Sequence, residues 1–294
     1  GSPLGGYDQQ IIKNKKYLNE NNIFFQPGIN EELAATSLWG TQQVNLRKKD
    51  KYDGVVGIWY GKGPGVDRAG DALKHVNLAG TSKFGGVIAL MGDDHICESS
   101  TTSHQSEFAM IDAMIPFLNP SGVQEILDYG IIGIELSRKS GCWVGIKCVH
   151  DNVSSGATVD LDENRVVLKD ISEENYPSDG LNIRLKDTAQ EKEYRLHHHK
   201  LKYVKEYCKL NNLNKLIFDS EKPRIGIIST GKSFLDTKLG LEKIGINKEI
   251  ANKIGIKFLK IAMPWPLEET VIEKFAENLD KIIVVEEKRS IIET

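Results

Sequence analysis

Cysteine is scarce in this sequence. The 294 residues include four cysteines, at positions 97, 142, 148 and 208, and they form neither a CxxC pair nor a zinc-type spacing. A small disulfide-stabilised scaffold is therefore excluded. We expect reduced thiols in a cytoplasmic protein and no metal bound by this chain.

Long hydrophobic runs and an excess of one charge are also missing. The longest apolar runs, 85–91 and 281–285, are far shorter than the roughly 20 residues that span a bilayer, so we expect no membrane segment. Lys and Arg total 38 against 41 Asp and Glu, which argues against a nucleic-acid or polybasic membrane binder. Small molecules and proteins are the expected partners. The sequence opens on Gly1 without methionine and ends soon after an apolar run, from which we expect a piece of a longer protein.

Short apolar runs alternate with longer helical patterns along the chain. This alternation is typical of α/β folds with parallel sheets covered by helices, so we predict two doubly wound domains with mainly parallel sheets. The expected strands are 23–25, 55–60, 86–91, 143–149, 224–229, 256–261 and 281–285. The expected helices are 9–19, 31–44, 68–79, 107–115, 123–137, 235–243 and 267–278.

The pattern changes between the two series of strands. Alternating apolar residues around Asp162-Glu163-Asn164 predict a β-hairpin excursion within 153–185. A charged helical stretch follows, read as a linker over 187–216. We therefore expect one domain over 1–186 and a second over 217–294.

Gly226 to Ser233 fits the phosphate-loop pattern GxxxxGK[ST] letter by letter. Its backbone amides and Lys232 would then cradle phosphates. Yet Gly226 lies inside an apolar run, and a phosphate loop would pull Ile227 and Ile228 out of a sheet core. The competing interpretation is a buried strand that turns into its helix at Gly231, with Lys232 in solvent.

Two predicted strand ends carry glycines or polar residues. Gly61, Gly63 and Gly65 follow one strand, and glycines allow a backbone to approach a ligand closely at the carboxyl edge of an α/β sheet. A long turn is the alternative. The stretch 92–107 follows another strand, and a polar run of this length is typical of an active-site loop, although a solvated loop is also compatible with it.

Several of these strings together resemble one known family. Gly1-Ser2-Pro3, Asn30-Glu31 with Ala34-Ala35 and Gly40, 60–68, 85–95 and 104–107 occur in the order found in the indolepyruvate ferredoxin oxidoreductase family, in its long single-chain form. The resemblance covers nearly the whole chain. It implies a thiamine diphosphate enzyme that oxidatively decarboxylates 2-oxo acids, here aryl pyruvates, to acyl-coenzyme A and passes electrons through iron–sulfur clusters to ferredoxin.

The resemblance also implies domain identities and residue roles. Residues 1–186 look like the pyrimidine-binding domain and 217–294 like a transketolase C-terminal-type domain, in a homodimer. Glu31 matches the catalytic glutamate that contacts the cofactor's aminopyrimidine ring, where a carboxyl promotes the reactive imino tautomer. Ser2 matches a position that meets the substrate carboxylate, and Gln105 and Glu107 match a loop that faces the active site.

The chain departs from the family in two respects. The Gly-Asp-Gly motif that holds magnesium and diphosphate is missing, and four scattered thiols cannot supply a Cys₄ cluster site. We expect those cofactors to be bound by regions outside this chain, which would be inactive alone. A phosphate-loop protein using Gly226 to Ser233 and a non-catalytic interaction module remain the alternatives.

Overall fold

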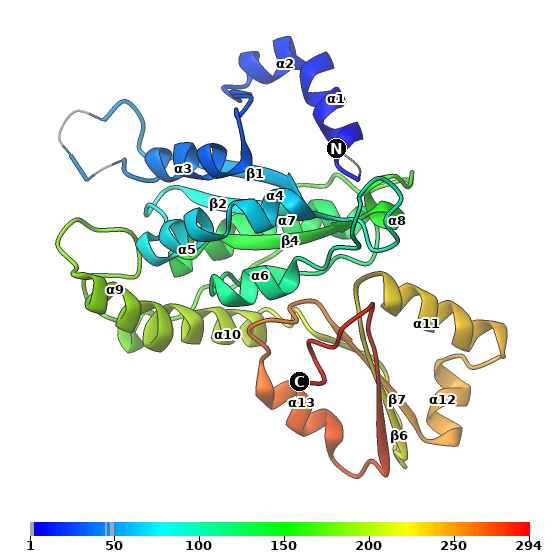
Figure 1. Ribbon diagram of the computed structural model, residues 1–294. Coiled ribbons are helices and arrows are strands. Elements are labelled where there is room, and N and C mark those ends of the chain that lie inside the picture. The colour runs from blue at the N-terminus through cyan, green and yellow to red at the C-terminus, as the bar shows by residue number, and fades with distance from the viewer. Residues whose placement is uncertain (1–2, 45, 48–49) are drawn as a thin grey trace.

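The computed structural model describes residues 3–44, 46–47 and 50–294. Two four-stranded sheets organise it (Figure 1), the first with strand order β1-β2-β4-β3 and the second with order β5-β7-β6-β8. The strands are β1 (Val56–Lys62), β2 (Gly86–Asp93), β3 (Phe117–Leu118), β4 (Val144–Val149), β5 (Lys215–Phe218), β6 (Ile225–Thr230), β7 (Ile256–Ile261) and β8 (Lys281–Val285).

The first sheet is wholly parallel and is covered on both faces. Helices α3 (Glu31–Thr41), α4 (Gly63–Arg68), α5 (Gly70–Ala79) and α6 (Glu107–Asp112) lie on one face and α7 (Val123–Ser140) on the other. Successive residues of β2 alternate between the two cores: Val87 and Ala89 join one and Ile88 the other. Burial on both faces explains why this strand is continuously apolar in sequence.

The second sheet is parallel except for β5, which runs antiparallel to β7. Helices α11 (Gly231–Lys243) and α12 (Lys248–Ile254) cover one face and α13 (Glu269–Ala276) the other. Both sheets together confirm the predicted α/β class with mainly parallel strands. The sheets meet at β3, where the Phe117 amide donates to the Trp265 carbonyl at 3.0 Å and the Asn119 amide to Ala262 at 2.8 Å.

The helical stretch between the sheets belongs to the first core rather than forming a free linker. It comprises α9 (Ala189–Arg195), a π-helical turn (Leu196–Lys200) and α10 (Leu201–Leu210). Tyr203, Val204 and Tyr207 of α10 are buried in the same cluster as Leu136 of α7. The stretch predicted as a charged helical linker is therefore helical but also buries one face against the first core.

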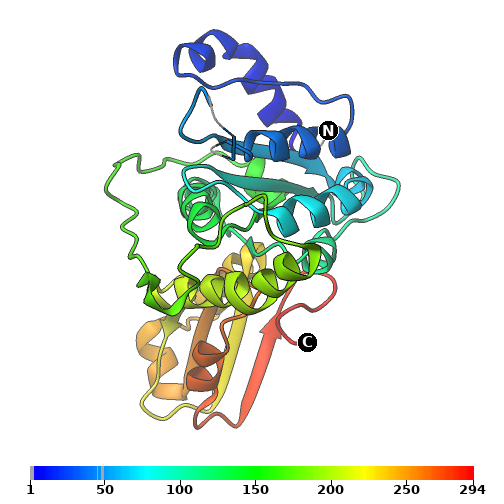
Figure 2. The ribbon, with the colours of Figure 1, turned by 90° about the vertical axis from the view of Figure 1, so that its left-hand side faces the viewer.

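The predicted hairpin within 153–185 is wrong. That stretch holds no strand, only the end of α8 (His150–Val153) and one 3₁₀ turn (Glu173–Asn175), and Figure 2 shows it as an extended green trace along one side of the molecule. Its alternation has a different cause, because Val166 and Leu168 pack against the first core whereas Val167 is exposed. A single extended segment lying on a surface produces the same two-residue period as a strand.

Three further differences concern the first 70 residues. The strand expected at 23–25 is not formed, and the helix expected at 9–19 is instead the pair α1 (Gly5–Lys13) and α2 (Lys15–Glu20). The glycine-rich stretch after β1 is not a long turn, since α4 begins directly at Gly63. No helix among the described residues has the length and apolar character needed to cross a membrane.

Candidate functional site at the carboxyl edge of the first sheet

The candidate site lies where β1 and β2 end. These parallel strands finish side by side, with Lys62 paired to Gly92, and the carboxyl edge of an open α/β sheet is its usual ligand-binding side. Helix α4 starts directly after β1, and a loop over residues 94–106 (the 94–106 loop) follows β2. Helix α3 packs against both β1 and α4.

Glu31 is the first residue of α3 and is half-buried. Asn30 caps the helix by accepting a hydrogen bond from the Leu33 amide at 2.8 Å. The indole of Trp59, a buried residue of β1, donates to the Glu31 carbonyl at 3.0 Å. The backbone at Glu31 is therefore fixed from two sides, while no described residue forms a hydrogen bond or ion pair with its carboxylate.

The three glycines make room for side chains of this chain. A Cβ at Gly65 would lie 2.5 Å from Cγ of Glu31, and one at Gly61 would lie 2.5 Å from the Trp59 ring. A Cβ at Gly63 would overlap the His104 ring. Glycine is thus required at each position by packing, and the side chain of Glu31 lies directly over the first turn of α4.

His104 is the functional candidate that sequence reasoning missed. Its ring lies against Gly63, with Nδ1 3.4 Å from Asp67 Oδ2 and Nε2 3.0 Å from the hydroxyl of Thr102. The His104 ring therefore lies against Gly63, and Glu31 lies against Gly65, two residues further along α4. The only signal in the sequence is a histidine within a polar loop, which does not reveal its neighbours.

Glu107 points into the interior, away from the loop surface. It is 4% exposed and forms an ion pair with the buried Lys147 of β4. Ser106 binds the neighbouring Asp93 through its amide at 2.9 Å. Burial, together with the nearby Glu107 charge, raises the pKa of Asp93. These groups hold the end of the loop against β2 and β4. Glu107 was expected to contact substrate, which requires an accessible carboxylate, but its side chain is buried beneath the loop.

Asp94 organises the start of the same loop. Its carboxylate accepts the amides of Glu98 and Ser99, each at 2.9 Å, and lies 3.9 Å from Lys62 Nζ. Burial raises the pKa of Asp94, but the amides and Lys62 outweigh it and lower the pKa to about 2. Asp94 therefore stays ionised and holds a tight turn.

Gln105 reaches across to the second domain. Its Nε2 donates to the Arg289 carbonyl at 2.8 Å, and its Oε1 accepts from the Arg289 amide at 3.1 Å. Both ends of the amide are thus used within the chain. Ser2 lies outside the described residues.

The phosphate-loop reading of 226–233 is wrong. Gly226, Ile227 and Ile228 belong to β6 and the two isoleucines are buried. Lys232 is half-buried and pairs with Asp236, one turn along α11. The segment is a core strand that enters a helix at Gly231, as the alternative interpretation predicted. Within the described part of the chain, no group of three or more His, Cys, Asp or Glu could hold a metal ion.

Comparison with known proteins shows which proteins this chain is similar to. The model of the indolepyruvate oxidoreductase domain matches residues 215–294. Relatives over most of the chain are the indolepyruvate oxidoreductase subunits IorA of Archaeoglobus fulgidus (27% identical, covering 78% of this chain and 34% of the relative), Pyrococcus horikoshii (26%, 92% and 39%) and Methanothermobacter marburgensis (23%, 95% and 41%). The chain is thus similar to these indolepyruvate oxidoreductase subunits over most of its length.

These similarities confirm the resemblance noted in the sequence. A solved structure of 2-oxoglutarate:ferredoxin oxidoreductase from Magnetococcus marinus, with 2-oxoglutarate, coenzyme A and succinyl-CoA bound, shares the fold, with a TM-score of 0.63 and 12% identity over 96% of this chain and 53% of that one. The chain spans 34% to 41% of the length of these indolepyruvate oxidoreductase subunits.

Proposed function

We propose that this chain supplies the pyrimidine-binding part of a thiamine diphosphate site in a 2-oxo acid:ferredoxin oxidoreductase. The reaction would be the oxidative decarboxylation of indolepyruvate or another aryl pyruvate to an acyl-coenzyme A, with ferredoxin as electron acceptor. The proposal agrees with the family. It is carried by one observation on the chain itself, the unpartnered carboxylate of Glu31 at the carboxyl edge of the first sheet.

The residues around Glu31 fit the aminopyrimidine end of that cofactor. Thiamine diphosphate supplies a carbanion at its thiazolium ring, which requires a proton to leave that ring. Glu31 would hold a proton on its carboxyl and donate it in a hydrogen bond to a ring nitrogen. The Asn30 cap and the Trp59 indole fix the helix start from which it acts. Gly61, Gly63 and Gly65 would form the adjoining wall, with the His104 ring lying on Gly63.

Other parts of the whole enzyme would complete this site. Magnesium, the diphosphate contacts and the iron–sulfur clusters are proposed to lie in regions outside this chain, and the second protomer of a homodimer would contribute to the site. Phe24 and Ile29 shortly before Glu31 are 70% and 92% exposed, as expected of apolar side chains that a partner covers. Substrate contacts would come from Ser2 and from the 94–106 loop, whose Gln105 amide and following Glu107 are already paired within the chain. The four free cysteines agree with a cytoplasmic enzyme.

The decisive experiment compares Glu31→Gln with Glu32→Gln in the full-length enzyme. Both residues occupy the first turn of α3, so each substitution removes a similar favourable interaction with the helix dipole, worth about 0.3–1 kcal/mol. Only Glu31 contacts α4. We expect Glu31→Gln to lower kcat by about 10² to 10⁴, as for loss of a general acid–base group, and Glu32→Gln to leave it unchanged.

The two substitutions also separate the proposal from its alternative. If the chain is a non-catalytic module and Glu31 only complements the helix dipole, both variants will lose the same small amount of stability. Cofactor-dependent activity would then not distinguish them. Full activity of Glu31→Gln, with thiamine diphosphate affinity unchanged, would remove the basis of the proposal.

A further inference from the structure

The end of the chain crosses back onto the first domain. Residues 286–292 follow β8, and we call them the C-terminal segment. The Gln105 side chain pairs with the backbone of Arg289 in both directions. The Arg289 guanidinium carbon lies 3.7 Å from the centre of the Phe108 ring. Gln105 and Arg289 are 184 positions apart in sequence.

The C-terminal segment is itself anchored in both domains. Glu286 accepts hydrogen bonds from the amides of Ile291 and Ile292, at 3.0 and 2.9 Å. Ile292 is buried in the core of the second sheet, whereas Ile291 packs against a core of the first domain. These hydrogen bonds and packing contacts fix the two ends of the C-terminal segment. The backbone of Arg289 between them therefore has a defined position opposite Gln105.

A second set of contacts reaches the start of the 94–106 loop. Lys288 Nζ donates to the His95 carbonyl at 3.2 Å, and Glu287 lies 3.5 Å from His95 Nε2. The other ring nitrogen of His95 contacts the His104 carbonyl at 2.7 Å. The loop is therefore closed on itself through His95 and His104, and the C-terminal segment holds it at both of its ends.

We propose that Gln105 and Arg289 are positioning residues that fix the 94–106 loop and thereby place His104 on Gly63. His104 adjoins Gln105 in sequence, so a loop released from Arg289 loses the constraint that presses this ring against α4. The functional consequence, a correctly shaped wall beside Glu31, rests on the proposed function. The positioning itself is a property of this chain and can be measured without cofactor.

The chain contains a matched control for this contact. Gln124 of α7 pairs with the backbone of Asp160 in the same two directions, with distances of 3.1 and 2.7 Å. That pair holds the strandless segment after α8. Replacing either glutamine by methionine removes its two hydrogen bonds to that backbone and keeps a side chain of similar length. Each glutamine also loses one side-chain contact, with Arg289 Nε at 3.4 Å for Gln105 and with Asp128 Oδ1 at 3.0 Å for Gln124. Only Gln105→Met acts on the loop.

The first measurement is amide hydrogen exchange on the 294-residue chain, without ligand. Two neutral hydrogen bonds correspond to about a 10- to 30-fold change in a local opening equilibrium. We expect Gln105→Met to speed exchange by about this factor in both the 94–106 loop and the C-terminal segment. Gln124→Met should speed exchange only near Asp160. Unchanged exchange of the loop in Gln105→Met, or an equal effect of both variants, would overturn the proposal.

The second measurement tests whether His104 is positioned. Imidazole ring signals in NMR spectra report the surroundings of each ring, and we expect those of His104 and His95 to move in Gln105→Met and to stay in Gln124→Met. Unmoved His104 signals in Gln105→Met would refute positioning. Because no cofactor is used, these outcomes are independent of the Glu31 experiment.

Discussion

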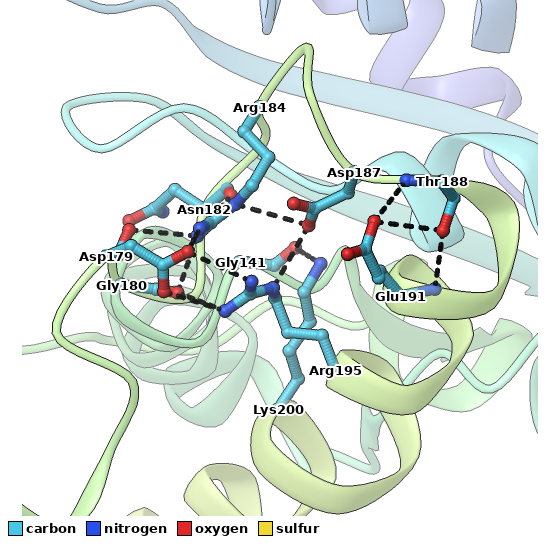
Figure 3. Close-up of polar contacts among 10 residues, drawn as sticks. All are labelled: Gly141, Asp179, Gly180, Asn182, Arg184, Asp187, Thr188, Glu191, Arg195 and Lys200. Atoms are coloured by element: carbon cyan, nitrogen blue, oxygen red, sulfur yellow. Dashed lines mark hydrogen bonds and ion pairs between the residues drawn. The ribbon is translucent and has the colours of Figure 1, made fainter.

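Lys200 is an ammonium group buried with few partners, and its removal should change how stability depends on pH. It is 2% exposed, and its Nζ donates to the Gly141 carbonyl at 3.2 Å. Figure 3 shows Arg184 and Arg195 nearby, both paired with Asp179 and Asp187. The two arginines already use the two carboxylates, which leaves Lys200 without a counter-ion of its own in that network.

Burial is the main cause of a low pKa at this lysine. Burial lowers the pKa of Lys200 from 10.5 to about 8, Cys142 opposes the shift, and the positive charges of Arg195 and Arg184 add to it. A folded pKa below the unfolded one means that folding disfavours the charged form. The unfavourable free energy of burying the charged lysine applies in full below pH 8 and disappears as the pH rises to 10.5. The difference corresponds to about 3 kcal/mol of destabilisation at pH 7.

Lys200→Met should therefore be more stable than wild type at neutral pH, with an advantage that shrinks in alkali. Loss of the Gly141 hydrogen bond offsets about 1 kcal/mol of the gain. From the linkage relation we expect the advantage to fall by about 2 kcal/mol between pH 7 and pH 9.5. Urea unfolding of both proteins at each pH measures this.

The exposed Lys202, two residues further along the chain, provides the control. Lys202→Met should follow the wild-type pH dependence, because the side chain is 57% exposed in its pair with Glu206. If Lys200→Met and wild type give parallel stability curves from pH 7 to 9.5, Lys200 is not charged and buried at neutral pH, and the reasoning fails.

Two further predictions concern the candidate site and its support. Gly65→Ala should displace Glu31 and lower the activity of the full-length enzyme by about 10²-fold, as expected when a catalytic group is misplaced by about 1 Å. Gly70→Ala is the control, because its Cβ would meet nothing within 4 Å. This variant should retain activity in the same assay. Lys147→Met leaves the Glu107 carboxylate buried without its cation and should destabilise the chain by about 3–5 kcal/mol in urea unfolding at pH 7. A loss below 1 kcal/mol would show that this ion pair does not hold the buried carboxylate.

Sequence patterns predicted the sheets well because burial leaves a direct record in hydrophobicity. β7 and β8 have the predicted bounds, 256–261 and 281–285, and the expected helix 31–44 placed Glu31 at a helix start, as observed. The same rule failed in 153–185, where side chains alternate between core and solvent without any strand partner. Periodicity reports which face is buried; it does not report whether the backbone is paired.

The contacts of the 94–106 loop were inaccessible for a different reason. Gln105 was expected to meet substrate because the family resemblance places it in a loop that faces the active site, yet its partner is a backbone 184 residues away. A backbone amide and carbonyl are present at nearly every residue, so no residue type marks Arg289 as that partner.

Among the residues that the structure describes, side-chain amides play this role in three places. Besides Gln105 and Gln124, Asn211 pairs with the backbone of Lys169, with distances of 2.7 and 3.1 Å. Each amide offers one donor and one acceptor at fixed spacing, which is what an unpaired extended backbone requires. Extended segments that belong to no sheet are thereby held in place by side-chain hydrogen bonds. At Gln105 the fastened segment comes from the other domain, so the shape of the loop beside Glu31 depends on how the two domains are docked.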